Sequence, residues 1–226
     1  MSCLFDSLDV WYDDLARTGA ENMAVDQMLM ENVVDRPLLR VYEWSEPSVS
    51  FGYFLPLLAA VSAFPGEKVN YVRRWTGGGV VDHRVDVTYT LVIPRGHSLA
   101  SMRGGGSYRE IHSVLAQVLV VLGQRVRVES SDLGDGRVEC FANPVAFDVT
   151  DQLGCKVAGA GQRRSKYGLL HQGSVIADVD RRVFFDHFTR KLSDDRQLFS
   201  LPEGWGCRAT DLARQRYATE EWLKKR

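Results

Sequence analysis

The chain has 226 residues, of which 45% are hydrophobic and 25% are charged, the balance of an ordinary globular enzyme. Lys and Arg number 28 against 29 for Asp and Glu, so the formal net charge is −1. A chain without an overall basic field cannot hold nucleic acid or an anionic membrane surface through its net charge. We therefore expect neither partner and predict that recognition is local.

The cysteines lack the paired spacing of a zinc site, and we predict no metal ligands among them: Cys3, Cys140, Cys155 and Cys207. The N-terminal segment lacks the basic start and apolar run of a signal peptide. We therefore expect reduced thiols and a cytoplasmic location. The longest apolar run, residues 114–122, is too short to span a bilayer and reads as a buried helix.

The expected elements follow from hydrophobic periodicity and from the placement of Gly and Pro. Helical patterns cover residues 19–34, 107–123, 181–192 and about 210 onward. β-formers predict two strands around a turn at 45–47 within 38–53, and further strands at 70–75, 85–93, 145–150, 155–162 and 169–177. No repeat or linker interrupts them, so we expect one α+β domain over residues 1–226.

The most informative segment is a glycine loop flanked by arginines: Arg73-Arg74-Trp75-Thr76-Gly77-Gly78-Gly79-Val80-Val81-Asp82-His83. Its three glycines allow backbone amides to approach a ligand, and the arginines add fixed charge, which is typical of an anion site. No Gly-Lys-Ser/Thr follows, and a β-rich segment rather than a helix comes next, so the loop is neither a P-loop nor a dinucleotide fingerprint. A Gly-rich hairpin turn is the alternative interpretation.

Cys140 lies at the end of a polar loop and ahead of a predicted strand, where a substrate could reach it. A free Cys is mostly protonated at neutral pH, so a nucleophilic one needs a neighbouring cation. Lys156 is the candidate, because the hairpin after Cys140 could return it to the same pocket. Cys155 and Lys156 are neighbours in a predicted strand, so their side chains should point to opposite faces and should not share a pocket. A buried, inert thiol and a solvated lysine are the alternatives for these residues.

Small residues after Lys156, among them Gly159, permit close approach of a ligand to the sheet. A lysine beside such a surface can hold a carbonyl or phosphate oxygen. His171-Gln172-Gly173-Ser174 could supply donors to the same site, although a single His is more often a structural residue.

Together these segments resemble the lipoate-protein ligase A and octanoyltransferase group of the biotin/lipoyl A/B protein ligase family. The matching pieces are Asn22 to Asp26, Trp44 to Tyr53, Arg73 to Gly79 with His83, Asp86 to Thr90, Asp148, Gly154, Lys156 to Gly159, Gln162, Arg164 and Leu170 to Ser174. They cover nearly the whole chain in order and spacing. The resemblance implies a three-layer α+β fold, shared with biotin ligases and similar to class II synthetases, in which helices pack a mixed, largely antiparallel sheet.

The resemblance also implies site roles. Lys156 would contact the acyl carbonyl, with His83, Gly159 and His171 beside the substrate and Val157 beside its apolar chain. The residues expected to contact the acyl group or its adenylate are Arg74, Thr76, Gly77, Gly78, Gly79, Val80, Val81 and Asp82.

Members of this group use two chemistries. Ligases form an acyl-adenylate from ATP with Mg²⁺, whereas octanoyltransferases pass an acyl chain from acyl carrier protein through an enzyme thioester. Cys140 in Cys-Phe-x-x-Pro, followed by Asp148 and Lys156, is similar to the nucleophile segment of LipM-type octanoyltransferases. The resemblance favours a transferase that needs no cofactor, with Cys140 and Lys156 as catalytic residues.

The chain is also short for a ligase with an accessory C-terminal domain, which favours a transferase or one half of a split ligase. The acceptor would be a lysine of a lipoyl domain of a 2-oxoacid dehydrogenase, or of the glycine-cleavage H protein. An ATP-dependent lipoate ligase is the alternative, and a non-catalytic acyl- or biotin-binding module is a third possibility.

Overall fold

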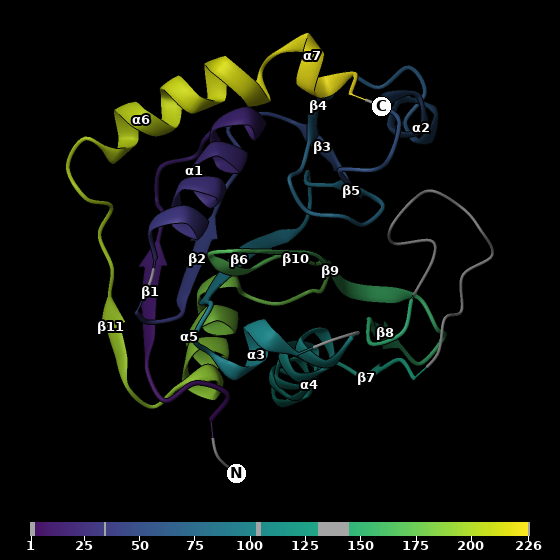
Figure 1. Cartoon of the computed structure of the whole chain (residues 1–226). Helices are drawn as coiled ribbons and strands as arrows, with labels where there is room; N and C mark the ends of the chain where they lie inside the picture. The colour runs from purple at the N-terminus through teal and green to yellow at the C-terminus, as the bar shows by residue number, and fades with distance from the viewer. Residues whose placement is uncertain (1–2, 34, 103–104, 131–144, 226) are drawn as a thin grey trace.

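The computed structural model describes residues 3–33, 35–102, 105–130 and 145–225. In this part of the chain, two sheets form (Figure 1). The larger has the order β11 (Arg196–Leu198), β1 (Leu8–Tyr12), β2 (Leu38–Tyr42), β6 (Val87–Pro94), β10 (Gly168–Val175), β9 (Lys156–Ser165), β8 (Val149–Asp151) and β7 (Val126–Val128). The smaller has the order β4 (Asn70–Arg73), β3 (Ser48–Phe51) and β5 (Val80–Asp82).

The large sheet is mixed and largely antiparallel, as the resemblance implies. Strand β1 runs parallel to both of its neighbours, β2 and β11. From β2 to β7 every neighbouring pair is antiparallel. In the small sheet, β3 is parallel to β4 and antiparallel to β5.

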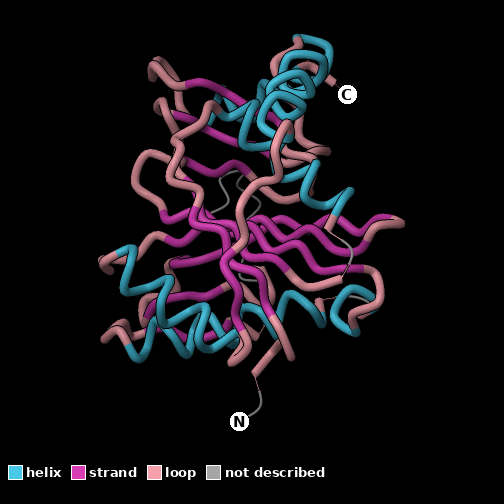
Figure 2. Tube along the Cα trace, turned by 90° about the vertical axis from the view of Figure 1, so that its left-hand side faces the viewer, coloured by secondary structure: helices cyan, strands magenta, loops and turns pink. Residues whose placement is uncertain are grey.

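Helices cover both faces of the large sheet, which gives three layers (Figures 1 and 2). One face carries α3 (Ser98–Ser101), α4 (Gly106–Val121) and α5 (Arg181–Leu192). The other carries α1 (Gly19–Asn32), α6 (Trp205–Leu212) and the π-helical turn η1 (Ala213–Tyr217). Helices α2 (Leu57–Ala63) and α7 (Glu220–Leu223) lie beside the small sheet. No helix in the described ranges is long and apolar enough to cross a bilayer.

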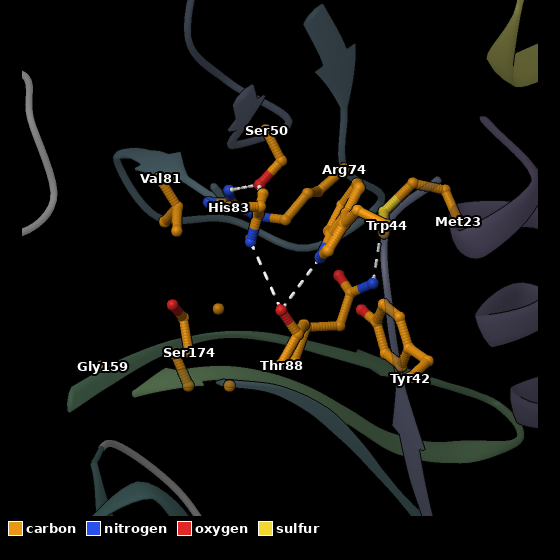
Figure 3. A pocket seen from close by; sticks show the side chains of 14 residues that line it. Met23, Tyr42, Trp44, Ser50, Arg74, Val81, His83, Thr88, Gly159 and Ser174 are labelled. Carbon is orange, nitrogen blue, oxygen red and sulfur yellow. Dashed lines mark hydrogen bonds between the residues drawn. The ribbon is translucent and has the colours of Figure 1, made fainter. Parts of the chain in front are cut away.

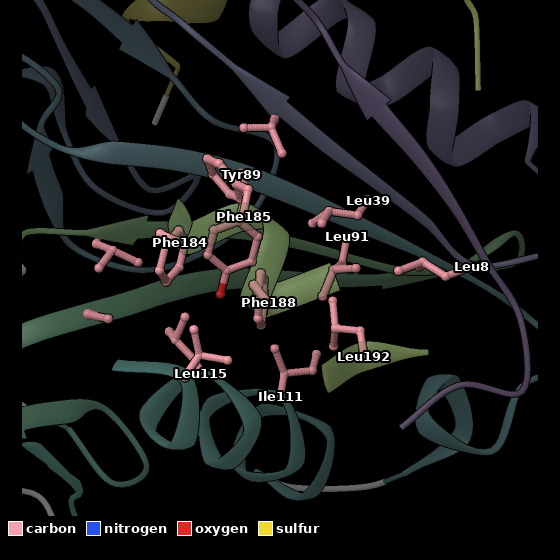
Figure 4. Packing of buried hydrophobic residues seen from close by; sticks show 14 of the residues in the cluster. Leu8, Leu39, Tyr89, Leu91, Ile111, Leu115, Phe184, Phe185, Phe188 and Leu192 are labelled. Carbon is pink, nitrogen blue, oxygen red and sulfur yellow. The ribbon is translucent and has the colours of Figure 1, made fainter. Parts of the chain in front are cut away.

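Successive side chains of the central strands point to opposite faces of the large sheet, so each strand contributes to the core on both sides. In β6, Leu91 and Ile93 pack against α4 and α5, whereas Val92 faces α1. Leu115 of α4 and Phe188 of α5 meet this strand in the lower layer (Figure 4). Strand β10 is buried along its whole length, yet its sequence GLLHQGSV carries His171, Gln172 and Ser174, so the buried sheet also holds polar side chains.

A buried ion-pair cluster fixes α1 on the sheet. Arg40 of β2 is fully buried and donates to Asp13 and to Asp26 of α1, each at 2.7 Å. Burial disfavours the charge of Arg40, but the two carboxylates outweigh it and raise the pKa of this side chain. A capping box between Thr18 and Glu21 begins the helix.

The structure differs from the sequence expectations in how the early strands pair. Strands β2 and β3 flank the expected turn at 45–47, yet they enter different sheets, because β2 pairs with β1 and β6 while β3 pairs with β4 and β5. Strands β1 and β11 and helix α2 were not predicted from the sequence. The helices at 19–32, 106–121 and 181–192 and the hairpin of β8 with β9 agree with expectation.

Candidate functional site

A narrow, mostly apolar cavity lies between the two sheets (Figure 3). Its volume is ≈ 20 Å³, room for about one water molecule. Side chains from α1, both sheets and the connections between strands form its wall: Met23, Tyr42, Trp44, Ser50, Arg74, Val81, His83, Thr88, Gly159, Ala160, Gly161, Gln172, Gly173 and Ser174.

Close backbone contacts hold the glycine loop over this cavity. Gly78 has a φ of 100°, a conformation that residues with a Cβ rarely adopt. A Cβ at Gly52 would overlap the carbonyl oxygen of Gly78, and a Cβ at Gly161 would overlap the Gly77 carbonyl and the Thr76 hydroxyl. The loop therefore packs directly on the backbone of its neighbours, and side chains at these positions would push it away.

The Arg74 side chain holds the glycine loop through hydrogen bonds to its backbone. Its Nη2 donates to the carbonyl oxygens of Gly77 at 3.2 Å and Gly79 at 2.8 Å, and its Nη1 donates to Ser50 Oγ at 2.7 Å. Because the guanidinium is a planar fork of donors, it fixes three acceptors at once. The structure thus gives Arg74 a loop-holding role in addition to its place in the cavity wall.

A hydrogen-bond chain connects the loop to α1. Thr76 Oγ1 donates to Gln172 Oε1 at 2.7 Å, and Gln172 Nε2 donates to Asp26 Oδ2 at 2.7 Å. Asp26 is also the partner of Arg40. The rigid ion-pair cluster under α1 therefore fixes the orientation of Gln172, a cavity residue.

A serine, a histidine and an aspartate form a hydrogen-bonded chain at the cavity wall. Ser50 Oγ lies 2.6 Å from His83 Nε2, and His83 Nδ1 lies 2.8 Å from Asp86 Oδ2. The carboxylate of Asp86 also accepts from the hydroxyls of Ser174 and Thr88. Trp44 stacks on the imidazole, with ring centroids 4.0 Å apart (Figure 3). These contacts leave His83 one orientation.

Lys156 forms a buried ion pair at the other side of the site. Its Nζ lies 2.7 Å from Asp148 Oδ2, and both side chains are almost fully buried. The Tyr108 hydroxyl of α4 donates to Asp148 Oδ1 at 2.5 Å and accepts the backbone N–H of Ala160 at 2.8 Å. Helix α4 thus holds the ion pair against β9.

Gly159 brings this ion pair to the cavity. It lines the cavity, and a Cβ at this position would overlap Cε and Nζ of Lys156. The lysine side chain therefore lies directly over the Gly159 backbone. Cys155, its neighbour in sequence, lies just before β9 and is exposed, so the two side chains do not share a pocket.

The structure places His171 on the opposite face of the sheet from the cavity. Its Nδ1 lies 2.9 Å from Gln162 Nε2 and its Nε2 lies 3.2 Å from the Tyr89 hydroxyl. Burial lowers the pKa of His171 well below its usual value, and His112 of α4, with ring centroid 5.6 Å away, lowers it further. His171 therefore belongs to a neutral, buried network under the sheet.

Of the other residues predicted to contact the substrate, some line the cavity and others pack in the hydrophobic core. Val81 lines the cavity, whereas Val80 packs with Val49 and Phe51, and Val157 packs in the layer that contains α4. Asp82 pairs with Arg84 at 2.6 Å on the surface. The predicted nucleophile Cys140 lies outside the described residues.

No role was predicted from the sequence for Ser50, Asp86 or Tyr108. Ser50 and Asp86 lie in segments that carry the family resemblance, which was the available signal. Tyr108 had none, because its partner Asp148 is 40 positions away.

Residues 18–214 match the model of the lipoyl protein ligase A/B catalytic domain. The chain belongs to this family. Octanoyltransferase LipM of Symbiobacterium thermophilum is 32% identical over an alignment 203 residues long that covers 83% of this chain and 68% of that protein.

Solved structures show the same family fold. Lipoate-protein ligase A bound with ATP superposes with a TM-score of 0.75 at 19% identity and covers 99% of each chain. The bi-partite lipoate protein ligase studied with its E2 lipoyl domain from Thermoplasma acidophilum gives a TM-score of 0.72 at 19% identity and covers 96% of each chain. They confirm the three-layer fold that the sequence resemblance implies.

Proposed function

We propose that this chain transfers an octanoyl or lipoyl group to a lysine of a lipoyl domain through a thioester on Cys140. The observation that carries the proposal is the buried Lys156–Asp148 pair beside an apolar cavity, in a chain 32% identical to an octanoyltransferase. A cavity with apolar walls and a few fixed polar groups suits an acyl chain with a reactive end.

The first step exchanges one thioester for another. The Cys140 thiolate attacks the thioester carbonyl of the acyl donor, a C–S bond to Cys140 forms, and the donor leaves as a thiolate. Lys156 is a charged donor next to Gly159 and is suited to stabilise the oxyanion of the tetrahedral intermediate, an effect worth about 3 kcal/mol per donor. In the second step the neutral amine of the acceptor lysine attacks the Cys140 thioester and a C–N bond forms. The C–S bond breaks and one amine proton leaves with the sulfur, so the products are the amide and the Cys140 thiol.

The acyl chain would lie among Met23, Tyr42, Trp44 and Val81. Each methylene removed from water contributes about 0.8 kcal/mol, so an octanoyl chain gains several kcal/mol by entering. The present volume of ≈ 20 Å³ is too small for it, so side chains of the wall must move aside. Met23 is suited to this because an unbranched thioether repacks easily.

The proposal specifies the partners. Acyl carrier protein is the expected donor, and lipoyl domains of 2-oxoacid dehydrogenases or the glycine-cleavage H protein are the expected acceptors. No cofactor takes part in thioester exchange, whereas the alternative ligase reaction would need ATP and Mg²⁺. A cytoplasmic location suits a catalytic thiol, because the glutathione pool there keeps thiols reduced.

Intact-protein mass spectrometry after mixing the enzyme with octanoyl-acyl carrier protein, without ATP, tests this function. We expect an octanoyl adduct that hydroxylamine removes and that maps to Cys140. Cys140→Ala should abolish the adduct, and Lys156→Ala should slow its formation by roughly 10²-fold or more.

Cys155→Ala is the matched control, since this exposed thiol neighbours Lys156 in sequence and should be dispensable. An unmodified enzyme that forms no adduct, but makes an acyl-adenylate from ATP, Mg²⁺ and lipoate, would show that the chain is a ligase. Tight acyl binding without either product would favour the non-catalytic module.

A further inference from the structure

We propose that a group of cations held on aromatic rings beside the glycine loop is the docking surface for the acidic carrier protein that delivers the acyl chain. This cation–aromatic surface consists of Tyr53, Trp75, Arg163, Arg216, Trp222 and Lys225. None of these six residues lines the cavity. The inference rests on the proposed function, because it names the surface that the expected donor contacts.

Three elements far apart in the sequence bring the cations together. The guanidinium of Arg163 in β9 lies 4.4 Å from the centroid of the Trp75 ring. The guanidinium of Arg216 in η1 lies 4.1 Å from Trp222 and 5.6 Å from Trp75. Lys225 follows α7, and its Nζ lies 5.2 Å from Trp222. The negative faces of the rings attract the cations and hold them in one place.

The positive charge of this surface is not balanced within the part of the chain that the structure describes. Lys224 pairs with Glu220 at 2.8 Å, whereas the three cations of the surface have no ion-pair partner among the described residues. Hydrogen bonding to Lys225, together with the charges of the two arginines, lowers the pKa of Tyr53. Like charges gathered in this way attract an anionic partner, whose binding relieves their repulsion.

The surface adjoins the proposed site. Arg163 lies two residues after Gly161 and therefore on the same face of β9, and Gly161 lines the cavity. Arg163 Nη1 donates to the carbonyl oxygen of Trp75 at 3.3 Å, and Trp75 precedes Thr76 of the glycine loop. A partner bound here is therefore next to the glycine loop, on the side of the sheet that carries the cavity.

Exposed apolar side chains indicate that the partner is a protein rather than a small anion. Phe54 is 86% exposed, and its ring centroid lies 5.0 Å from that of Tyr53. Leu58, in the first turn of α2, is 74% exposed. Aromatic residues and arginines beside exposed apolar side chains are the composition of protein–protein interfaces. The complementary surface would carry carboxylates around an apolar residue.

Arg163 favours the donor over the acceptor as the occupant. Its Nε is buried and has no hydrogen-bond partner among the described residues, and a buried donor without an acceptor costs free energy. A guanidinium matches two phosphate oxygens at once. An acyl carrier protein holds its acyl chain on a phosphate-linked arm, whereas a lipoyl domain offers a lysine. The donor therefore supplies the acceptor oxygens that Arg163 lacks.

Fluorescence anisotropy with dye-labelled holo-acyl carrier protein, which has the arm but no acyl chain, measures docking without turnover. We expect Arg163→Gln and Lys225→Gln each to weaken binding by about fivefold at low ionic strength, and Lys225→Arg to bind normally. Raising the ionic strength should reduce the difference between the charge variants and the unmodified protein. The holo form should bind more tightly than the apo form, which lacks the phosphate.

Arg190→Gln is the matched control, because it removes one exposed positive charge from α5 on the opposite side of the sheet. Unchanged binding in both test variants, or an equal loss in the control, would overturn the docking surface. A loss seen only with a lipoyl domain as the probe, or equal binding of the holo and apo forms, would overturn the assignment to the donor. An unmodified enzyme that binds the carrier here but forms no octanoyl adduct would overturn the proposed transfer and not the docking surface.

Discussion

At the scale of single residues, Gly159 decides where the amine of Lys156 lies. The Lys156 side chain crosses directly over its Cα to reach Asp148, and the cavity begins on the same glycine. Glycine in a strand costs stability, and here the close approach of a charged side chain explains its presence.

Gly159→Ala should therefore displace Lys156 rather than merely fill space. A misplacement of about 1 Å costs roughly 100-fold in rate, so we expect a loss of this order in octanoyl-enzyme formation, measured by mass spectrometry. Gly96→Ala is the control, because a Cβ there meets nothing within 4 Å. Equal rates for both variants would contradict the placement of the amine.

At the scale of elements, α4 acts as the support of the β8–β9 hairpin. Its Tyr108 hydroxyl connects Asp148, just before β8, to the backbone of Ala160 in β9. Strand β8 contains only three residues and has a register shift at Val149 and Thr150, so its own ladder holds it weakly. Helix α4, through Tyr108, therefore helps to hold β8 against β9.

Removing that hydroxyl should weaken the hairpin. We expect Tyr108→Phe to lower the free energy of unfolding by about 1–3 kcal/mol, because a partly buried N–H and a buried carboxylate each lose a partner. Chemical denaturation measures this loss. Tyr12→Phe, on an exposed residue of β1, should change stability by less than about 0.5 kcal/mol, and a similar effect of the two substitutions would contradict the role of Tyr108.

At the scale of the whole molecule, two buried histidines make stability depend on pH. Burial lowers the pKa of His112 to about 4, although Asp148 opposes the shift, and burial also lowers that of His171. The unfolded chain binds protons at these positions below about pH 6.5, where the folded chain does not. Stability is therefore intact above pH 6.5 and falls as the pH drops toward 4.

For His112 the loss between pH 7 and pH 5 is on the order of 2 kcal/mol. We expect His112→Gln to be less stable at pH 7 but to lose about 2 kcal/mol less than the unmodified protein between these pH values, as urea unfolding would measure. His187→Gln should keep the unmodified pH dependence. If His112→Gln kept it too, the histidine would not be the acid-sensitive group.

The sequence by itself determined the family, the fold class and most of the helices, because periodic apolar patterns and short-range motifs are local properties. The glycine loop and Lys156 were also identified in this way. The pairing of β2 and β3 in different sheets depended on long-range contacts that no local pattern encodes.

Only the tertiary structure decided which polar groups meet. Ser50 and His83 are 33 positions apart, and Tyr108 and Asp148 are 40 apart. Sheet register alone puts Gln172 and Ser174 in the cavity wall and His171 on the opposite face. Because side chains alternate along a strand, a shift of one residue would reverse this assignment, and that register is set by the whole fold.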